Sequence, residues 1–217
     1  MEDVPKTDRK SKFDVEYEQL FARGHSRDPS GRYIVPLPLK AGGTSLLGES
    51  LTQARIALST MHRRMKRDPK LGAEYVRFVE DYIRLGHMRR LTPSEVEDLT
   101  VAVCYICHHG IWQKGDTEDK LRVVFNASRP TSSGYSLNDV MHAGPKLQND
   151  LAVVVTRWRT HRIVFCVDVK MMFRQIQVQQ EHVHLQRILW SPNPETPARS
   201  RRRRRKRTLC GRLPQRS

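Results

Sequence analysis

The apolar pattern of this sequence ends at Trp190, and this limit constrains the fold more than any other feature. Up to that residue, short apolar runs alternate with polar turns, as in a globular protein. Beyond it, Ser191-Pro192-Asn193-Pro194 cannot continue a strand, and residues 199–207 are almost entirely Arg and Lys. We therefore expect the hydrophobic core to be built from residues before 191.

The net charge of +16 is concentrated in the same C-terminal stretch. Residues 191–217 contain ten Lys and Arg and one Glu, so more than half of the net charge lies there. We expect an Arg-rich disordered tail that attracts phosphates nonspecifically and has the composition of a nuclear localisation signal. An alternative is a frameshifted translation, because the tail shares no pattern with the residues before it.

The remaining composition indicates an intracellular protein, cytoplasmic or nuclear. No apolar segment has the length of a signal peptide or a membrane span, so no membrane partner is expected. The four cysteines (Cys104, Cys107, Cys166 and Cys210) follow no spaced framework, which favours free thiols in a reducing compartment.

The periodicity predicts a mixed α+β chain, with α/β as the open alternative. Residues 1–46 read as a polar arm or linker, in which prolines confine the extended segment 31–39 to an edge or a linker. Two helices are expected between residues 47 and 86, and a capping box at 92–95 starts a short third one. Strands are expected at 101–106, 121–125, 163–167 and 186–190, with a helix opened by Gly144-Pro145 between the second and third strands.

Asp168 is the first candidate site residue. It follows the predicted apolar strand 163–167, where a carboxylate suits a hard cation such as Mg²⁺. On chemistry alone, a turn-capping role is the commoner one for an aspartate at a strand end.

Two further patterns leave alternatives open. Arg122 alternates out of an apolar strand, where its guanidinium could meet a phosphate group or serve only as an exposed edge cation. Residues 104–108, Cys-Tyr-Ile-Cys-His, have the spacing of a haem attachment or the start of a zinc site. No second Cys/His pair follows at zinc-finger distance, so we expect packing rather than metal there.

Taken in order, several segments resemble the polymerase of BEL/Pao-type LTR retrotransposons, whose polyproteins carry the Pao-type aspartic peptidase of family A17. The resemblance covers most of the chain, from about residue 18 to residue 190. The segments that carry it are 25–27, 31–35, 82–88, 108–111, 120–128, 136–139, 144–148, 168–176 and 186–190.

The resemblance implies an RNA-directed DNA polymerase, with residues 47–190 forming the fingers and the start of the palm of an incomplete right-hand polymerase. Asp168 would be the first catalytic aspartate and would bind Mg²⁺, with the Val169 carbonyl as a further ligand. RNA template, DNA primer and deoxynucleoside triphosphates would be the partners.

The resemblance also implies the nucleotide contacts. Arg122 would contact the triphosphate, and the backbone amides of Met171 and Met172 would lie near it. Phe173, five residues after Asp168, would be the aromatic gate that excludes a ribose 2′-OH.

The sequence also departs from the family. Asn126 stands where aspartate is usual, Phe173 where tyrosine is usual, and Cys107 where proline is usual. No Tyr-x-Asp-Asp motif and no further aspartate follow Asp168. Two-metal catalysis needs more than one carboxylate, so we expect a truncated polymerase that is inactive alone. The rival hypothesis is a nonenzymatic nucleic-acid-binding protein that uses the basic helix within 47–86 and the Arg-rich tail.

Overall fold

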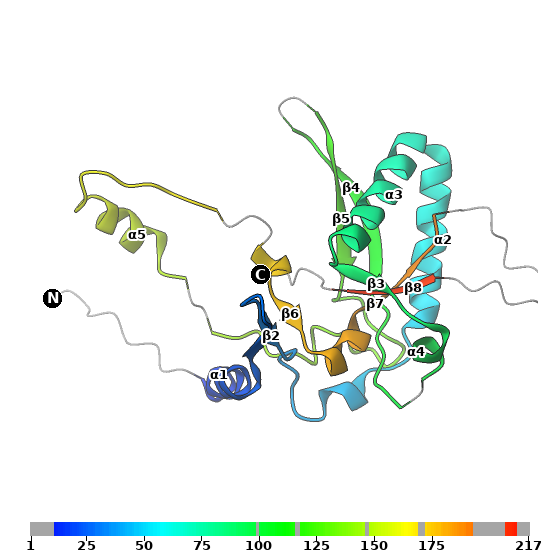
Figure 1. Ribbon diagram of the computed structural model, residues 1–217, viewed down its shortest axis with the longest axis horizontal. Helices are drawn as coiled ribbons and strands as arrows, with labels where there is room; N and C mark the ends of the chain where they lie inside the picture. Colours follow the sequence, from blue (N-terminus) through cyan, green and yellow to red (C-terminus); the bar gives the residue numbers. More distant parts are fainter. Residues whose placement is uncertain are drawn as a thin grey trace, which may run out of the picture.

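The computed structural model is a mixed α+β protein, as the sequence predicted (Figure 1). It describes residues 11–98, 100–115, 118–145, 148–168, 172–192 and 207–211, with the backbone alone at Phe173 and 207–211. The helices are α1 (Lys12–Gly24), η1 (Gly43–Leu46), α2 (Leu51–Arg67), α3 (Pro69–Arg84), α4 (Pro93–Glu97), α5 (Leu151–Trp158), η2 (Met172–Arg174) and η3 (Gln180–Gln186). The strands are β1 (Ser26–Arg27), β2 (Tyr33–Val35), β3 (Met88–Arg90), β4 (Cys107–Gln113), β5 (Lys120–Asn126), β6 (Gln177–Val178), β7 (Arg187–Trp190) and β8 (Arg207–Gly211).

Helices α2 and α3 are the two helices expected between residues 47 and 86. Asp68 ends α2 and caps α3, because its carboxylate accepts a hydrogen bond from the Leu71 N–H at 3.0 Å. Pro69 occupies the first turn of α3, where its missing N–H is not needed. Gly86 follows α3 with a positive φ of 70°, a conformation that glycine adopts without strain.

The hairpin of β4 and β5 packs against this helix pair. The two strands are antiparallel, in register from Cys107 opposite Asn126 to Gln113 opposite Lys120. Gly110 lets α3 approach β4 closely, because a Cβ there would lie 3.1 Å from the ring of Tyr75. Figure 1 shows the hairpin beside α2 and α3 and extending past them at its turn.

The hydrophobic core lies where the helices, the hairpin and β7 meet. Tyr75 of α3 is fully buried and stacks on Trp190 of β7 with a centroid distance of 5.2 Å. The buried core residues of these elements are Ala54, Leu58, Met61, Met65, Leu71, Tyr75, Val79, Tyr82, Val123, Phe125, Ile188, Leu189 and Trp190.

A three-stranded sheet of order β3-β8-β7 adjoins this core. β8 pairs antiparallel with both neighbours, with Trp190 opposite Arg207. The sequence predicted β7 but no ordered element after Trp190, so β8 is an addition to the expected architecture. The stretch 193–206 therefore connects two strands that are hydrogen-bonded side by side.

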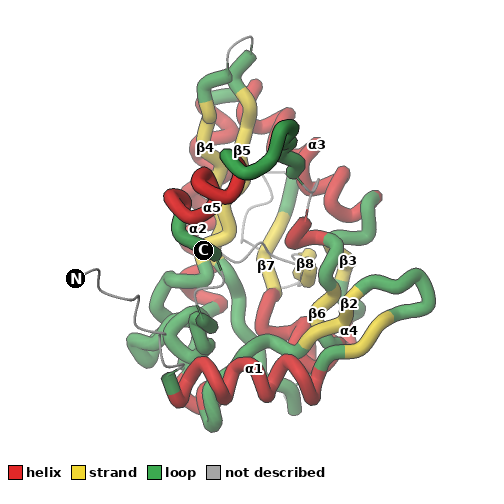
Figure 2. The backbone as a smooth tube through the Cα atoms, turned by 90° about the vertical axis from the view of Figure 1, so that its left-hand side faces the viewer, coloured by secondary structure: helices red, strands yellow, loops and turns green. Residues whose placement is uncertain are grey.

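A second three-stranded sheet, of order β1-β2-β6, joins the N-terminal region to a later part of the chain. β2 pairs with β1 on one side and in parallel with β6 on the other, so residues 33–35 form a central strand and not the edge or linker that we predicted. Pro36 and Pro38 follow the strand, where they interrupt no ladder. Figure 2 shows α1 beneath this sheet, at one end of the molecule.

Two predicted strands are absent. Residues 101–106 form no regular strand and contribute only an isolated parallel bridge, between Tyr105 and Arg187. Residues 163–167 have no strand partner in the described chain and run exposed after α5. The predicted helix after Gly144-Pro145 begins only at Leu151, capped by Asp150, and Lys146 and Leu147 lie outside the described residues.

No helix in the described part of the chain is long and apolar enough to cross a membrane.

Candidate nucleic-acid interface

The β4–β5 hairpin has two distinct faces. Along β5 the burial alternates, with Val123 and Phe125 directed to the core and Lys120 and Arg122 exposed. Cross-strand partners share a face, so Gln113 lies beside Lys120 and Ile111 beside Arg122. The outer face therefore combines two cations with an apolar side chain, Ile111, that is 42% exposed.

Arg122 lies where the sequence predicted it, on the outward side of an apolar strand. Its side chain is exposed, and it has no ion-pair partner among the residues that the structure describes. A guanidinium presented in this way offers several N–H donors in one plane, which suits phosphate oxygens. Helices α2 and α3 pack on the other face of the hairpin that carries Arg122. Arg122 is therefore held more rigidly than a cation on a loop would be.

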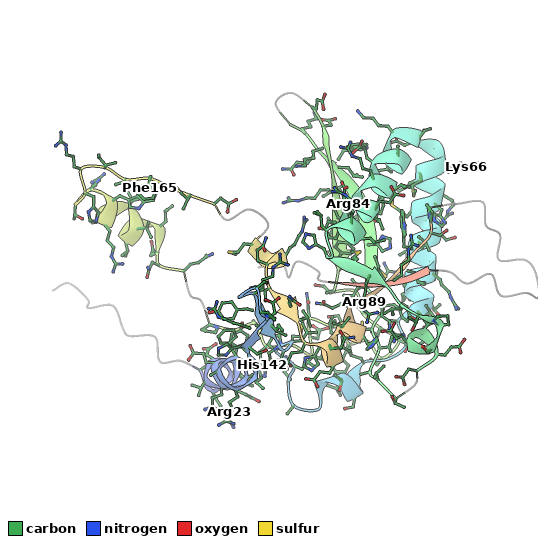
Figure 3. All side chains as sticks on the ribbon, in the orientation of Figure 1. Arg23, Lys66, Arg84, Arg89, His142 and Phe165 are labelled. Carbon is green, nitrogen blue, oxygen red and sulfur yellow. The ribbon has the colours of Figure 1, made fainter. Side chains whose placement is uncertain are left out.

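Asp168 is not at the end of a strand. It follows an irregular segment in which Ile163, Phe165 and Val167 are 80%, 82% and 77% exposed. Figure 3 shows Phe165 on an arm that extends away from the hairpin and from α2 and α3. The strand predicted at 163–167 would need hydrogen-bonding neighbours, and the described residues supply none for it.

The other predicted site residues are only partly described. Met172 begins η2 and is 48% exposed, while Phe173 is described by its backbone alone. Val169 and Met171 lie outside the described residues. No contact between Asp168 and Arg122 is present among the described residues.

The residues present do not fit a two-metal centre. Within the described ranges there is no group of three or more His, Cys, Asp or Glu side chains that could hold a metal ion. Asp168 is a single exposed carboxylate. Two divalent ions at catalytic separation need several carboxylate oxygens, which the described residues do not bring together.

The Cys-x-x-Cys-His pattern is part of the core. Burial raises the pKa of the Cys104 thiol to about 11 and also raises the pKa of Cys107, so both stay protonated and poor as ligands. Both ring nitrogens of His108 are occupied, Nδ1 by the Tyr75 hydroxyl at 2.6 Å and Nε2 by the Leu189 carbonyl at 2.7 Å. This geometry leaves His108 unavailable to a haem or zinc ion.

A buried cation went unnoticed in the sequence. Arg187 is 1% exposed, and its guanidinium donates to the Glu95 carbonyl at 2.7 Å and to Nδ1 of His184 at 2.9 Å. Glu95 itself forms a bidentate pair with Arg89, which holds the pKa of Glu95 at about 2. One sequence feature could have indicated the burial of Arg187, namely its place at the start of the apolar run 187–190. All four residues of this run are buried.

Comparison with known proteins adds no assignment: no family model, no curated protein and no solved structure matches the chain.

Proposed function

We propose that this chain is the fingers and the start of the palm of an RNA-directed DNA polymerase of the BEL/Pao retrotransposon type, and that it does not polymerise alone. The observation that supports this best is the presentation of Arg122 on the outer face of a hairpin braced by two helices. A nucleotide-contacting arginine has to be held in a fixed orientation to meet a triphosphate, because the benefit of a bidentate contact depends on geometry.

The neighbours of Arg122 are consistent with this role. Lys120 lies two residues away on the same face and adds a second cation for phosphate oxygens. Ile111, opposite Arg122, offers an apolar surface to the sugar or base of a deoxynucleoside triphosphate. An RNA template and a DNA primer would complete the complex, with Met171, Met172 and Phe173 as further nucleotide contacts in the proposal.

The limit on activity follows from the carboxylates. Polymerisation activates a primer 3′-OH and stabilises the leaving pyrophosphate, and each task needs a metal ion held by carboxylate oxygen. The sequence has no aspartate after Asp168 to share that task. In this proposal Asp168 is the first of the catalytic carboxylates. The chain can contact the nucleotide through Arg122, but it lacks the further carboxylates that polymerisation needs.

Primer extension tests the proposed inactivity. With an RNA template, a DNA primer, Mg²⁺ and deoxynucleoside triphosphates, we expect no template-directed incorporation, because the metal ions have one aspartate instead of several. A complete reverse transcriptase in the same assay is the positive control. Incorporation that disappears in Asp168→Asn would contradict the proposal, whereas incorporation that survives this change would identify a contaminating polymerase.

A nonenzymatic nucleic-acid-binding protein is the second candidate, favoured by the five cations and absence of acids in α2. The two candidates differ in their response to a nucleotide. If the chain is polymerase-derived, the complementary deoxynucleoside triphosphate strengthens binding to a primer–template, and Arg122→Ala removes this effect. If the nucleotide has no effect on the intact chain, the second candidate is the better description.

A further inference from the structure

The solvent-exposed side of α2 is cationic and polar, apart from Ile56, which is 52% exposed. The helix contains no Asp or Glu, and its five cations, Arg55, Arg63, Arg64, Lys66 and Arg67, are all exposed. The hydroxyl side chains of Thr52, Ser59 and Thr60 are exposed among them. Arg63 donates to Thr60 Oγ1 at 3.2 Å, which holds its guanidinium along the helix surface.

Helical periodicity places these groups on one side. Residues on α2 turn by about 100° per position, so the buried stripe of Ala54, Leu58, Met61 and Met65 faces the core. Arg63 and Arg67 project from the side opposite this stripe, and Arg55 lies on the flank of the helix. From Arg55 to Arg67 the helix rises about 18 Å, which spans several phosphates of a nucleic-acid strand.

The neighbouring helix shows that this charge is specific to α2. Helix α3 has three cations and three acids, so its net charge is zero. Two of its arginines pair within the helix, Arg77 with Glu74 at 3.6 Å and Arg84 with Asp81 at 2.8 Å. Helices α2 and α3 pack into the same core, but α3 is neutral and α2 carries a charge of +5. The positive potential is therefore concentrated along α2.

The α2 face is separate from the face that carries Arg122. The core lies between them, because the buried stripe of α2 and the inner side of the hairpin both pack into it. The exposed side of α2 therefore points away from the outer face of β4 and β5. A ligand along α2 does not compete with a nucleotide at Arg122.

We propose that the exposed face of α2 binds the phosphate backbone of double-helical nucleic acid without reading its sequence. This goes beyond the polymerase proposal, because it needs neither Asp168 nor Arg122. The face has no exposed aromatic side chain on which single-stranded bases could stack. Membrane binding is disfavoured because the apolar side of the helix is buried in the core and cannot enter a bilayer.

The salt dependence of duplex binding tests this inference. The affinity of the full chain for a short fluorescent RNA–DNA duplex is measured by anisotropy at several salt concentrations. In the triple variant Arg55→Gln/Arg63→Gln/Arg67→Gln, the slope of log affinity against log salt is expected to fall by about 2 to 3, because each lost phosphate contact removes about 0.9. Glutamine keeps the helix propensity of these positions, and circular dichroism checks the fold.

The matched control removes the same charge elsewhere. Arg77→Gln/Arg84→Gln/Arg90→Gln changes three exposed arginines of α3 and β3 and should leave the slope near its original value. Lysine at positions 55, 63 and 67 should restore the slope, since counterion release depends on charge. All variants keep the Arg-rich tail, so the contribution of the tail to the salt slope is the same in each and cancels when the variants are compared.

Equal slope changes in the two glutamine variants would overturn the inference, because they would show a response to net charge alone. An effect confined to single-stranded probes would overturn the assignment to a duplex. Loss of binding to phosphatidylserine vesicles with unchanged duplex binding would assign the face to a membrane and would also overturn it.

Discussion

Replacement of Tyr75 by alanine should lower the free energy of unfolding by about 4 kcal/mol, the scale of removing a buried aromatic side chain. Tyr75 is fully buried in α3, stacks on Trp190 and donates its hydroxyl hydrogen to Nδ1 of His108. Its removal creates a cavity where α3, β4 and β7 meet. Urea denaturation followed by tryptophan fluorescence measures the change.

Two control variants isolate the cause. Tyr75→Phe keeps the ring and leaves the buried acceptor on His108 unpaired, so a loss of about 1 to 2 kcal/mol is expected. Tyr135→Ala removes an exposed tyrosine, 47% accessible, and should change stability by less than about 0.5 kcal/mol. The packing described for Tyr75 is wrong if its alanine variant loses no more than the Tyr135 variant.

The second large effect is a loss of stability as the pH falls from about 6.5 to 4. Desolvation by burial lowers the pKa of His108 to about 4, and the charges of His109 and His62 act in the same direction. The unfolded state, with an ordinary histidine pKa, binds a proton in this window before the folded state does. Stability is therefore full above pH 6.5 and falls by about 3 kcal/mol by pH 4.

His108→Gln separates this effect from other titrations. The glutamine amide can still donate to the Leu189 carbonyl and accept from the Tyr75 hydroxyl, but it does not titrate. Burial also lowers the pKa of His182 and His184, so some pH dependence remains in the variant. The prediction concerns the difference between the two chains. If unfolding free energies of wild type and His108→Gln fall in parallel from pH 6.5 to 4, His108 does not carry the effect.

The elements that the sequence predicted well are those with local signals. The stripe of Ala54, Leu58 and Met61 defines α2 whatever it packs against, and Asp68-Pro69 marks the boundary with α3 by capping chemistry. The alternation of Val123 and Phe125 with Arg122 defines β5 in the same way. Each of these patterns is complete within one element.

The elements that the sequence missed depend on distant partners. Residues 163–167 have a strand composition, yet a strand forms only beside another strand. β8 arises because β3 and β7 offer edges on both sides, which no local pattern around residues 207–211 reveals. The contact of Arg187 with the Glu95 carbonyl joins residues 92 apart in the sequence, and hydrophobic periodicity does not predict such a pair.

The candidate site shows the same contrast between residues with local sequence signals and residues that depend on distant partners. The exposed position of Arg122 follows from strand alternation, so the sequence could predict it. The surroundings of Asp168 depend on which strands flank it, so the sequence did not predict that this residue would follow an exposed, irregular segment.

The affinity of a tail-neutral chain for an RNA–DNA primer–template tests the central claim most directly, namely that the folded body binds nucleic acid. Glutamine replaces the seven cations between residues 199 and 206, while Arg207 stays because it begins β8 and pairs with Trp190. Deleting residues 191–217 would remove a sheet strand and confuse binding with folding. We expect salt-dependent binding to persist with a smaller slope, because the cations of α2 and of the hairpin remain. Complete loss of binding in this correctly folded variant would contradict the account and assign nucleic-acid binding to the tail alone.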